Sequence, residues 1–311
     1  MSFGLLFSGQ GAQVVGMGLS LYKGSAMARS VYDLADQILG IELKEHCFYG
    51  PEAKLTETCV CQPALFVQGV ATVEILKHLG KLEQPSCSLG LSLGELTAMH
   101  VAGVYDFETG LKLVAARGRL MQEACDSTEG GMAVLIGGSR EKAFELAELA
   151  DVDVANLNCP GQIVLSGEKK HIGTVLENAK GLGFKMAKEL NVAGAYHSRL
   201  MQGAADAFAD VLSPMKFATP DVPVYTNTTG KAISDPDEIK QALVKQITGS
   251  VYFEDCLINA TKDTGETQFF ECGPGAVLAG LAKRTDRSLD VKPLAEYVDI
   301  SSKTGETRFI S

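Results

Sequence analysis

The segment Gly90-Leu91-Ser92-Leu93-Gly94 has the residue types of a serine nucleophile held on a tight turn. A run of small residues precedes it, and residues 95–101 have the pattern of a helix that Gly103 ends. In the order strand, pentapeptide, helix, the two glycines permit a turn that lifts the serine hydroxyl clear of a sheet. The backbone N–H of Leu93 would then lie at a helix N-terminus, where a negative oxygen is stabilised. A plain turn is the alternative, because glycine and serine are common residues.

A serine hydroxyl is unreactive at neutral pH without a base, and the chain has five histidines. Three of them have charged or polar neighbours at helix positions, which is typical of a solvated surface. His100 lies on the helix that leads away from Ser92. His197 precedes a helix within a run of small residues, where a side chain can lie over a cleft between domains. We therefore expect His197 to be the base, with a purely structural histidine as the alternative.

Arg117 lies among apolar residues in an expected helix over residues 107–125, which Asp106 would cap. A cation in so apolar a neighbourhood needs an anionic partner. The sequence by itself nevertheless favours an arginine on the solvated stripe of the helix, next to Arg119.

The glycine-rich turn Ser8-Gly9-Gln10-Gly11 follows an apolar strand over residues 3–7. It is not a dinucleotide fingerprint, because the third glycine of that motif would fall at Val14. No Gly-Lys-Ser/Thr sequence is present, which excludes a Walker loop. We expect this turn to bring backbone N–H groups close to a substrate.

The fold class is predicted as α/β, with a large α/β-hydrolase-like domain around a parallel sheet and a small inserted domain. Residues 132–190 have the order strand, helix, strand, strand, helix, strand, which is that of a ferredoxin-like unit. The large domain would comprise residues 1–127 and 196–311, and the small domain residues 128–195. Pro63 is expected at the start of a buried helix that ends at residue 79, and the chain after Asp290 as a loosely attached tail.

The composition is that of a soluble globular protein, with 46% apolar residues and a net charge of −10. The acidic balance argues against nucleic-acid binding, and we expect no apolar run to be long enough to span a membrane. The N-terminus lacks the pattern of a signal peptide. The eight cysteines are scattered without metal-ligand spacing, so we expect no metal and a cytoplasmic, reduced protein.

Ordered sequence blocks along nearly the whole chain resemble the malonyl-CoA:acyl-carrier-protein transacylase family. The blocks are Phe7-Ser8-Gly9-Gln10-Gly11, Gly50-Pro51-Glu52, Gln62-Pro63-Ala64-Leu65, Gly90-Leu91-Ser92-Leu93-Gly94-Glu95, Arg117-Gly118 with Met121, Asn158-Cys159-Pro160-Gly161-Gln162, His197-Ser198 with Met201, Gln246, and Gly273-Pro274-Gly275. The chain departs from the family pattern at Leu91, where a histidine is usual, and at Ser8, where a proline is usual.

The resemblance implies that Ser92 is the nucleophile and His197 its base. The family has no carboxylate in this role, and a backbone carbonyl at Gln246 would orient the histidine. The oxyanion hole would consist of the backbone N–H groups of Gln10 and Leu93.

The resemblance also implies residues that select the acyl group. Arg117 would bind the free carboxylate of a malonyl group, which reverses the interpretation from the sequence alone. A guanidinium can bind a carboxylate through two hydrogen bonds and would favour malonyl over acetyl. Tyr196 would crowd a 2-methyl group, and Met121 completes the predicted substrate site.

The implied reaction transfers malonyl from malonyl-CoA to the phosphopantetheine thiol of acyl carrier protein in fatty-acid synthesis, without metal or redox cofactor. The expected partners are malonyl-CoA and acyl carrier protein, with no nucleic acid or membrane, and the protein is expected to be a monomer. One alternative is a serine thioesterase, in which water replaces the thiol. The other is a non-catalytic protein that binds a carrier protein.

Overall fold

The larger of two sheets organises the computed structural model, which describes residues 3–302. Its strand order is β10-β9-β1-β2-β7-β8, in which all neighbours are parallel except β7 and β8. The strands are β1 (Gly4–Phe7), β2 (Cys87–Gly90), β7 (Val224–Tyr225), β8 (Ala232–Ile233), β9 (Gln268–Cys272) and β10 (Asp290–Pro293). The predicted parallel sheet is confirmed, and β8 adds an antiparallel edge that was not predicted.

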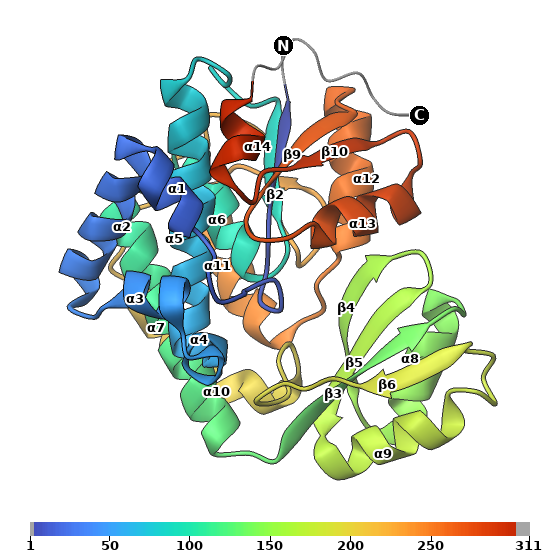
Figure 1. Ribbon diagram of the computed structural model, residues 1–311. Helices are drawn as coiled ribbons and strands as arrows, with labels where there is room; N and C mark the ends of the chain where they lie inside the picture. The colour runs from blue at the N-terminus through green and yellow to red at the C-terminus, as the bar shows by residue number, and fades with distance from the viewer. Residues whose placement is uncertain (1–2, 303–311) are drawn as a thin grey trace.

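Both faces of this sheet are covered by helices (Figure 1). Leu5 and Phe7 of β1 belong to the core on one face, whereas Leu6 between them belongs to the core on the other. This alternation follows from the two-residue period of a strand. The helices are α5 (Thr58–His78), α6 (Leu93–Val101) and α7 (Phe107–Asp126) on the first face, and α12 (Phe253–Thr264) and α13 (Val277–Thr285) on the second.

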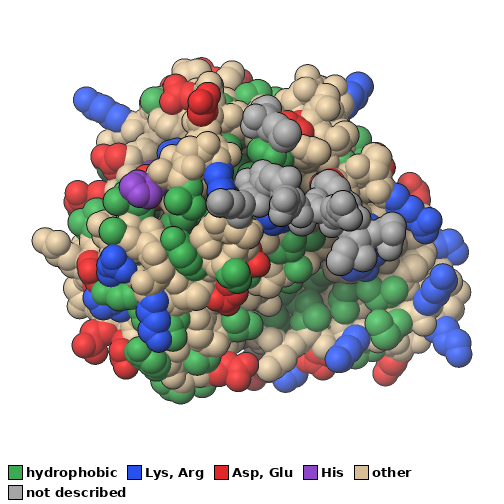
Figure 2. Space-filling view, turned by 45° about the horizontal axis from the view of Figure 1, so that its top comes forward, with side chains coloured by type: hydrophobic (Ala, Val, Ile, Leu, Met, Phe, Trp, Pro, Cys, Tyr) green, Lys and Arg blue, Asp and Glu red, His purple; other side chains and the backbone are tan. Residues whose placement is uncertain are grey.

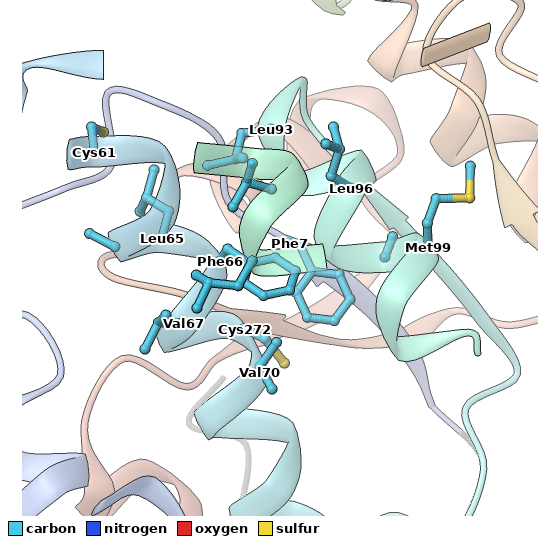
Figure 3. Close-up of a cluster of buried hydrophobic side chains, with 14 of the residues drawn as sticks. Phe7, Cys61, Leu65, Phe66, Val67, Val70, Leu93, Leu96, Met99 and Cys272 are labelled. Atoms are coloured by element: carbon cyan, nitrogen blue, oxygen red, sulfur yellow. The ribbon is translucent and has the colours of Figure 1, made fainter. Parts of the chain in front are cut away.

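Helix α5 runs through the first core, where Phe66 and Val70 lie near Phe7 (Figure 3). It begins at Thr58, so the prediction that Pro63 starts the helix was wrong. It is also long and apolar enough to cross a membrane, which was not expected, but 89% of its most apolar window is buried inside the protein. Its apolar residues therefore serve the core of the fold.

Several short helices and strands of the larger unit were not predicted from the sequence. Those before α5 are α1 (Leu19–Gly24), α3 (Leu43–Tyr49) and α4 (Glu52–Thr56), which flank the longer, amphipathic α2 (Ala26–Leu39). The prediction of a loosely attached tail after Asp290 was also wrong as far as Ser302. In this segment β10 extends the sheet, and α14 (Tyr297–Ser301) packs near α1 and α5. The remainder of that predicted tail, residues 303–311, lies outside the described residues.

The second sheet is antiparallel and has the order β4-β5-β3-β6. Its strands are β3 (Gly130–Ile136), β4 (Asp153–Cys159), β5 (Gln162–Glu168) and β6 (Met186–Glu189), with α8 (Arg140–Ala150) and α9 (Lys169–Asn178) packed on one face. The predicted order of strands and helices in this segment is confirmed. The unit lies beside the larger one in Figure 1, and the chain enters it from α7.

Backbone hydrogen bonds along β4 connect the smaller sheet to the segment of the larger unit that precedes α12. Val251 donates its N–H to the carbonyl of Ala155 at 2.8 Å and accepts from the N–H of Leu157 at 2.9 Å. Arg140 at the start of α8 forms ion pairs with Glu254 and Asp255 of α12. On the face that Figure 2 shows, positive and negative side chains are interspersed around a hollow that contains hydrophobic side chains.

After the small unit, the chain returns through His197 to three helical segments, which bring Gln246 back to the end of the large sheet. These segments are the single 3₁₀ turn η1 (Arg199–Met201), α10 (Gln202–Leu212) and α11 (Pro236–Thr248). Pro236 is the first residue of α11, and Asp235 caps it.

The turn between β2 and α6 leaves no room for side chains at its two glycines. An ideal Cβ at Gly94 would lie 2.0 Å from the carbonyl oxygen of Phe7, and one at Gly90 would lie 2.1 Å from the carbonyl carbon of Gly94. The glycines therefore allow α6 to pack directly against the backbone of β1.

Replacing Gly94 by alanine should lower the free energy of unfolding by about 1–3 kcal/mol, because the backbone must shift to admit the methyl group. Chemical denaturation measures this loss. Gly280→Ala is the matched control, because Gly280 lies within α13 and an added Cβ meets no atom within 4 Å. That variant should gain up to about 1 kcal/mol, and a Gly94→Ala variant as stable as the wild type would contradict the packing argument.

Candidate active site

Ser92 occupies the turn between β2 and α6 with a left-handed backbone conformation, φ 53° and ψ −104°. A non-glycine residue rarely adopts this conformation, and surrounding contacts must hold it there. The backbone N–H of Ser92 donates to Asn227 Oδ1 at 2.7 Å, and Asn227 Nδ2 donates to the carbonyl of Gly90 at 2.9 Å. The Asn227 side chain thus bridges the turn.

His197 lies against the hydroxyl of Ser92. Its Nε2 is 2.7 Å from Ser92 Oγ, and its Nδ1 is 2.7 Å from the backbone carbonyl of Gln246. A carbonyl can only accept, so Nδ1 carries the proton and Nε2 is free to accept the proton of the serine. The predicted pairing of Ser92 with His197, and the predicted place of the Gln246 carbonyl, agree with this geometry.

Burial determines the protonation of His197, which is only 4% exposed. The pKa of His197 is lowered to about 4, mainly by loss of solvation and also by the charge of Arg117, while the hydrogen bond to the carbonyl of Gln246 opposes both effects. The imidazole is therefore neutral at neutral pH, as a general base must be.

Arg117 reaches the same hydroxyl from α7. Its guanidinium donates to Ser92 Oγ at 3.2 Å, to Gln246 Oε1 at 2.9 Å and to Gln62 Oε1 at 2.7 Å. The side chain is 1% exposed, so the solvated stripe favoured from the sequence alone was wrong. By contrast, Arg119 lies on the solvent side and pairs with Glu123.

The charge of Arg117 is held in an apolar environment. Burial lowers its pKa to about 10, while the negative charge of Glu95 opposes this shift. All three hydrogen-bond acceptors of the guanidinium are neutral oxygens. A carboxylate that entered beside Ser92 would therefore find a desolvated cation.

Two backbone N–H groups are candidates for an oxyanion hole. Leu93 is the first residue of α6, so its N–H has no partner within the helix. Gln10 lies in the loop after β1, and both residues line a cavity of about 220 Å³ together with Ser92, Arg117 and His197. The structure thus brings the predicted oxyanion donors to the same cavity as the predicted nucleophile.

The predicted substrate residues Tyr196 and Met121 also line this cavity. The Tyr196 hydroxyl accepts from Gln10 Nε2 at 3.3 Å, and burial raises its pKa. Met121 Sδ lies 3.6 Å from Gln62 Nε2. Every predicted site residue therefore lies within one connected group.

Several members of this group were not assigned a role from the sequence. Gln62 Nε2 donates to the hydroxyl of Thr58 at 2.9 Å, and that hydroxyl donates to Gln10 Oε1 at 2.6 Å. Glu95 accepts from Gln246 Nε2 at 2.5 Å and from the N–H of Asn227 at 3.0 Å. The available signal for Asn227 was its position just beyond β7, after Thr226, because ligands of parallel sheets gather at strand ends.

Leu91, the residue before Ser92, lines the cavity and packs partly against the second core. An ideal Cβ at Gly9 would lie 2.8 Å from Leu91 Cδ2, so the leucine side chain fills the space beside the first loop. Within residues 3–302, no group of three or more His, Cys, Asp or Glu side chains is arranged to hold a metal ion.

Comparison with known proteins shows which family the chain belongs to. Residues 5–304 match the family described as acyl transferase domain. A malonyl CoA-acyl carrier protein transacylase of Bacillus subtilis is 38% identical, with 91% of this chain and 90% of the relative covered. The protein of the same name from Synechocystis is 37% identical, with 96% of this chain and 98% of the relative covered.

Solved structures agree with these relatives. The malonyl CoA-acyl carrier protein transacylase of Coxiella burnetii superposes with a TM-score of 0.92 at 34% identity, over 96% of each chain. A malonyl-transacylase solved in complex with a type II PKS acyl-carrier protein has a TM-score of 0.91 at 34% identity, over 96% of this chain and 98% of the other. The chain therefore belongs to the acyl transferase domain family.

Proposed function

We propose that this protein transfers a malonyl group from malonyl-CoA to the phosphopantetheine thiol of acyl carrier protein, through a malonyl ester of Ser92. The observation that carries the proposal is the position of Arg117, which donates to the hydroxyl that His197 also contacts. In a malonyl thioester the free carboxylate lies two carbons from the reacting carbonyl. One acyl group can therefore reach the guanidinium and the nucleophile together. The names and bound partner of the relatives support the same reaction.

In the first step the Ser92 Oγ–H bond breaks and its proton goes to His197 Nε2. Oγ forms a bond to the thioester carbonyl carbon, and the negative oxygen that results is stabilised by the N–H groups of Gln10 and Leu93. The C–S bond then breaks, and the CoA thiolate takes the proton from His197. The product is malonyl-Ser92 and free CoA.

The second step is the same chemistry in reverse, with a different thiol. The phosphopantetheine thiol gives its proton to His197 Nε2, and its sulfur attacks the ester carbonyl. The C–O bond to Ser92 breaks, and Oγ recovers the proton from His197. The carbonyl of Gln246 holds the imidazole in the required tautomer during both steps.

We further propose a fold type and residue bounds for each of the two units, as predicted from the sequence. The larger unit is proposed as α/β-hydrolase-like, with residues 1–127 and 196–311, and the smaller as a ferredoxin-like insertion over residues 128–195. The strand order β4-β5-β3-β6 supports the ferredoxin-like assignment. A cytoplasmic location, a monomeric state, and a reaction without metal or redox cofactor stay predictions.

A serine thioesterase and a non-catalytic carrier-binding protein are the two competing functions. Intact-protein mass spectrometry after mixing with malonyl-CoA separates all three. We expect a malonyl adduct on Ser92 that persists in buffer and disappears when phosphopantetheinylated acyl carrier protein is added. Ser92→Ala should give no adduct, whereas Ser30→Ala, at an exposed position of α2, should behave as the wild type.

Two results would contradict the proposed transfer. An adduct lost at the same rate in buffer as with carrier protein identifies a hydrolase. No adduct with any acyl thioester identifies a binding protein.

Replacing Arg117 by alanine should lower kcat/KM for malonyl-CoA by about 100-fold or more, because the carboxylate loses its charged partner. Acylation by acetyl-CoA should change by less than about threefold, since acetyl has no carboxylate. Arg119→Ala removes a side chain that is 57% exposed on the same helix and serves as the control. Equal losses with both thioesters would exclude Arg117 as the selective residue.

The pH dependence of Ser92 acylation should follow His197. Because its pKa is lowered to about 4, the imidazole is already neutral well below pH 7. We expect kcat/KM to be constant between about pH 6 and 8 and to fall as the pH approaches that pKa, where the base becomes protonated. Stopped-flow acylation measures the profile, and a fall centred near the ordinary histidine value of about 6.5 would contradict it.

A further inference from the structure

Glu95 is a carboxylate with no access to solvent, 0% exposed, in the first turn of α6. Its Oε2 accepts both recorded hydrogen bonds, from Gln246 Nε2 at 2.5 Å and from the N–H of Asn227 at 3.0 Å. Its Oε1 has no hydrogen-bond partner among the described residues. A buried charge with one unpaired oxygen is costly, so its position calls for a function.

The first neighbour of Glu95 leads to the nucleophile. Asn227 donates its backbone N–H to the carboxylate, while its side chain accepts from the N–H of Ser92 and donates to the carbonyl of Gly90. Glu95 thereby fixes the residue that braces the strained turn.

The second neighbour, Gln246, leads to the base and to the cation. Its backbone carbonyl orients His197, and its Oε1 accepts from Arg117. A carboxylate only accepts hydrogen bonds, so the amide must turn its Nε2 toward Glu95 and its Oε1 toward the guanidinium. Glu95 thus determines which way the Gln246 amide faces.

Charge gives a second connection between Glu95 and Arg117. The guanidinium is buried and bonded to neutral oxygens, and the charge of Glu95 favours its protonated form. Burial raises the pKa of Glu95, whereas the hydrogen bonds that its carboxylate accepts and, more weakly, the charge of Arg117 oppose this shift. Because a buried cation without an anion is strongly disfavoured, the pair is retained as two charges.

We propose that Glu95 is a positioning residue whose negative charge acts on both Arg117 and His197 by way of Gln246. This inference rests on the proposed malonyl transfer. By offsetting the charge of Arg117, Glu95 weakens the hold on the carboxylate of the bound substrate. By adding negative charge behind His197, it stabilises the imidazolium that exists only while the proton is in transit.

These two effects change different kinetic constants. Weaker binding of the carboxylate applies equally to the bound substrate and to the transition state, so it raises KM. Stabilisation of the imidazolium applies to the transition state alone, so it raises kcat. Removing the charge of Glu95 should therefore lower both kcat and the KM for malonyl-CoA.

Glu95→Gln is suited to this test because Oε2 makes both contacts and Oε1 makes none. The glutamine oxygen can keep the two contacts while its NH₂ group replaces the unpaired oxygen, so mainly the charge is lost. We expect kcat to fall about tenfold, and KM for malonyl-CoA to fall about threefold or more, while KM for acetyl-CoA stays constant. Glu95→Asp retains the charge, so its KM for malonyl-CoA should equal that of the wild type.

A probe without a carboxylate separates this inference from the proposed function. Phenylmethylsulfonyl fluoride is neutral and reacts with a serine that a histidine activates. We expect Glu95→Gln to slow sulfonylation of Ser92 about tenfold, because His197 must still take the proton. If the wild type forms no malonyl adduct but Glu95→Gln slows sulfonylation, the malonyl function fails and the role of Glu95 toward His197 stands.

Glu271→Gln is the matched control for loss of a buried carboxylate. Glu271, the last but one residue of β9, is buried and accepts from the N–H groups of Leu278 and Ala279 and from Ser8 Oγ at 3.5 Å. Within the described residues, no hydrogen bond joins its side chain to Ser92 or His197. Glu271→Gln should lower the thermal midpoint and change kcat and KM by less than about twofold. Unchanged sulfonylation in Glu95→Gln, or a KM that rises for malonyl-CoA and acetyl-CoA together, overturns the inference.

Discussion

The arrangement of the site depends on how closely α6 approaches the backbone of β1. A methyl group at Gly94 would lie within 2.0 Å of the Phe7 carbonyl, so this approach is possible only for glycine. The same contact places the first turn of α6 beside the loop that contains Gln10. One backbone-to-backbone contact therefore positions Ser92 and both candidate oxyanion donors, and the side chains that complete the candidate site are arranged around it.

Those side chains form a buried polar network in which each group restricts the next. Gln246 uses its carbonyl, its amide oxygen and its amide nitrogen for three different partners, His197, Arg117 and Glu95. Such a network is stable only when nearly every member is satisfied, since unpaired polar groups are costly in a low dielectric. The histidine consequently needs no carboxylate in direct contact, because a fixed carbonyl orients it.

The sequence predicted local features better than distant ones. The turn at Ser92 and the position of His197 beside it were predicted from motif, spacing and the neighbours of each histidine. The burial of Arg117 did not, because its partners Gln62 and Gln246 lie 55 and 129 residues away and only the fold brings them together. The four residues of β10 were missed because so short an edge strand carries little periodicity.

The first loop has a mechanical consequence for the reaction. A chain of hydrogen bonds runs from Arg117 to Gln62, then to the hydroxyl of Thr58, and then to the side chain of Gln10. The guanidinium of Arg117 and the loop that contains Gln10, a candidate oxyanion donor, are thus connected along one wall of the cavity. Neither can shift far without straining the two hydrogen bonds of the Thr58 hydroxyl, so the structure restricts the position of the loop through a residue on a different helix.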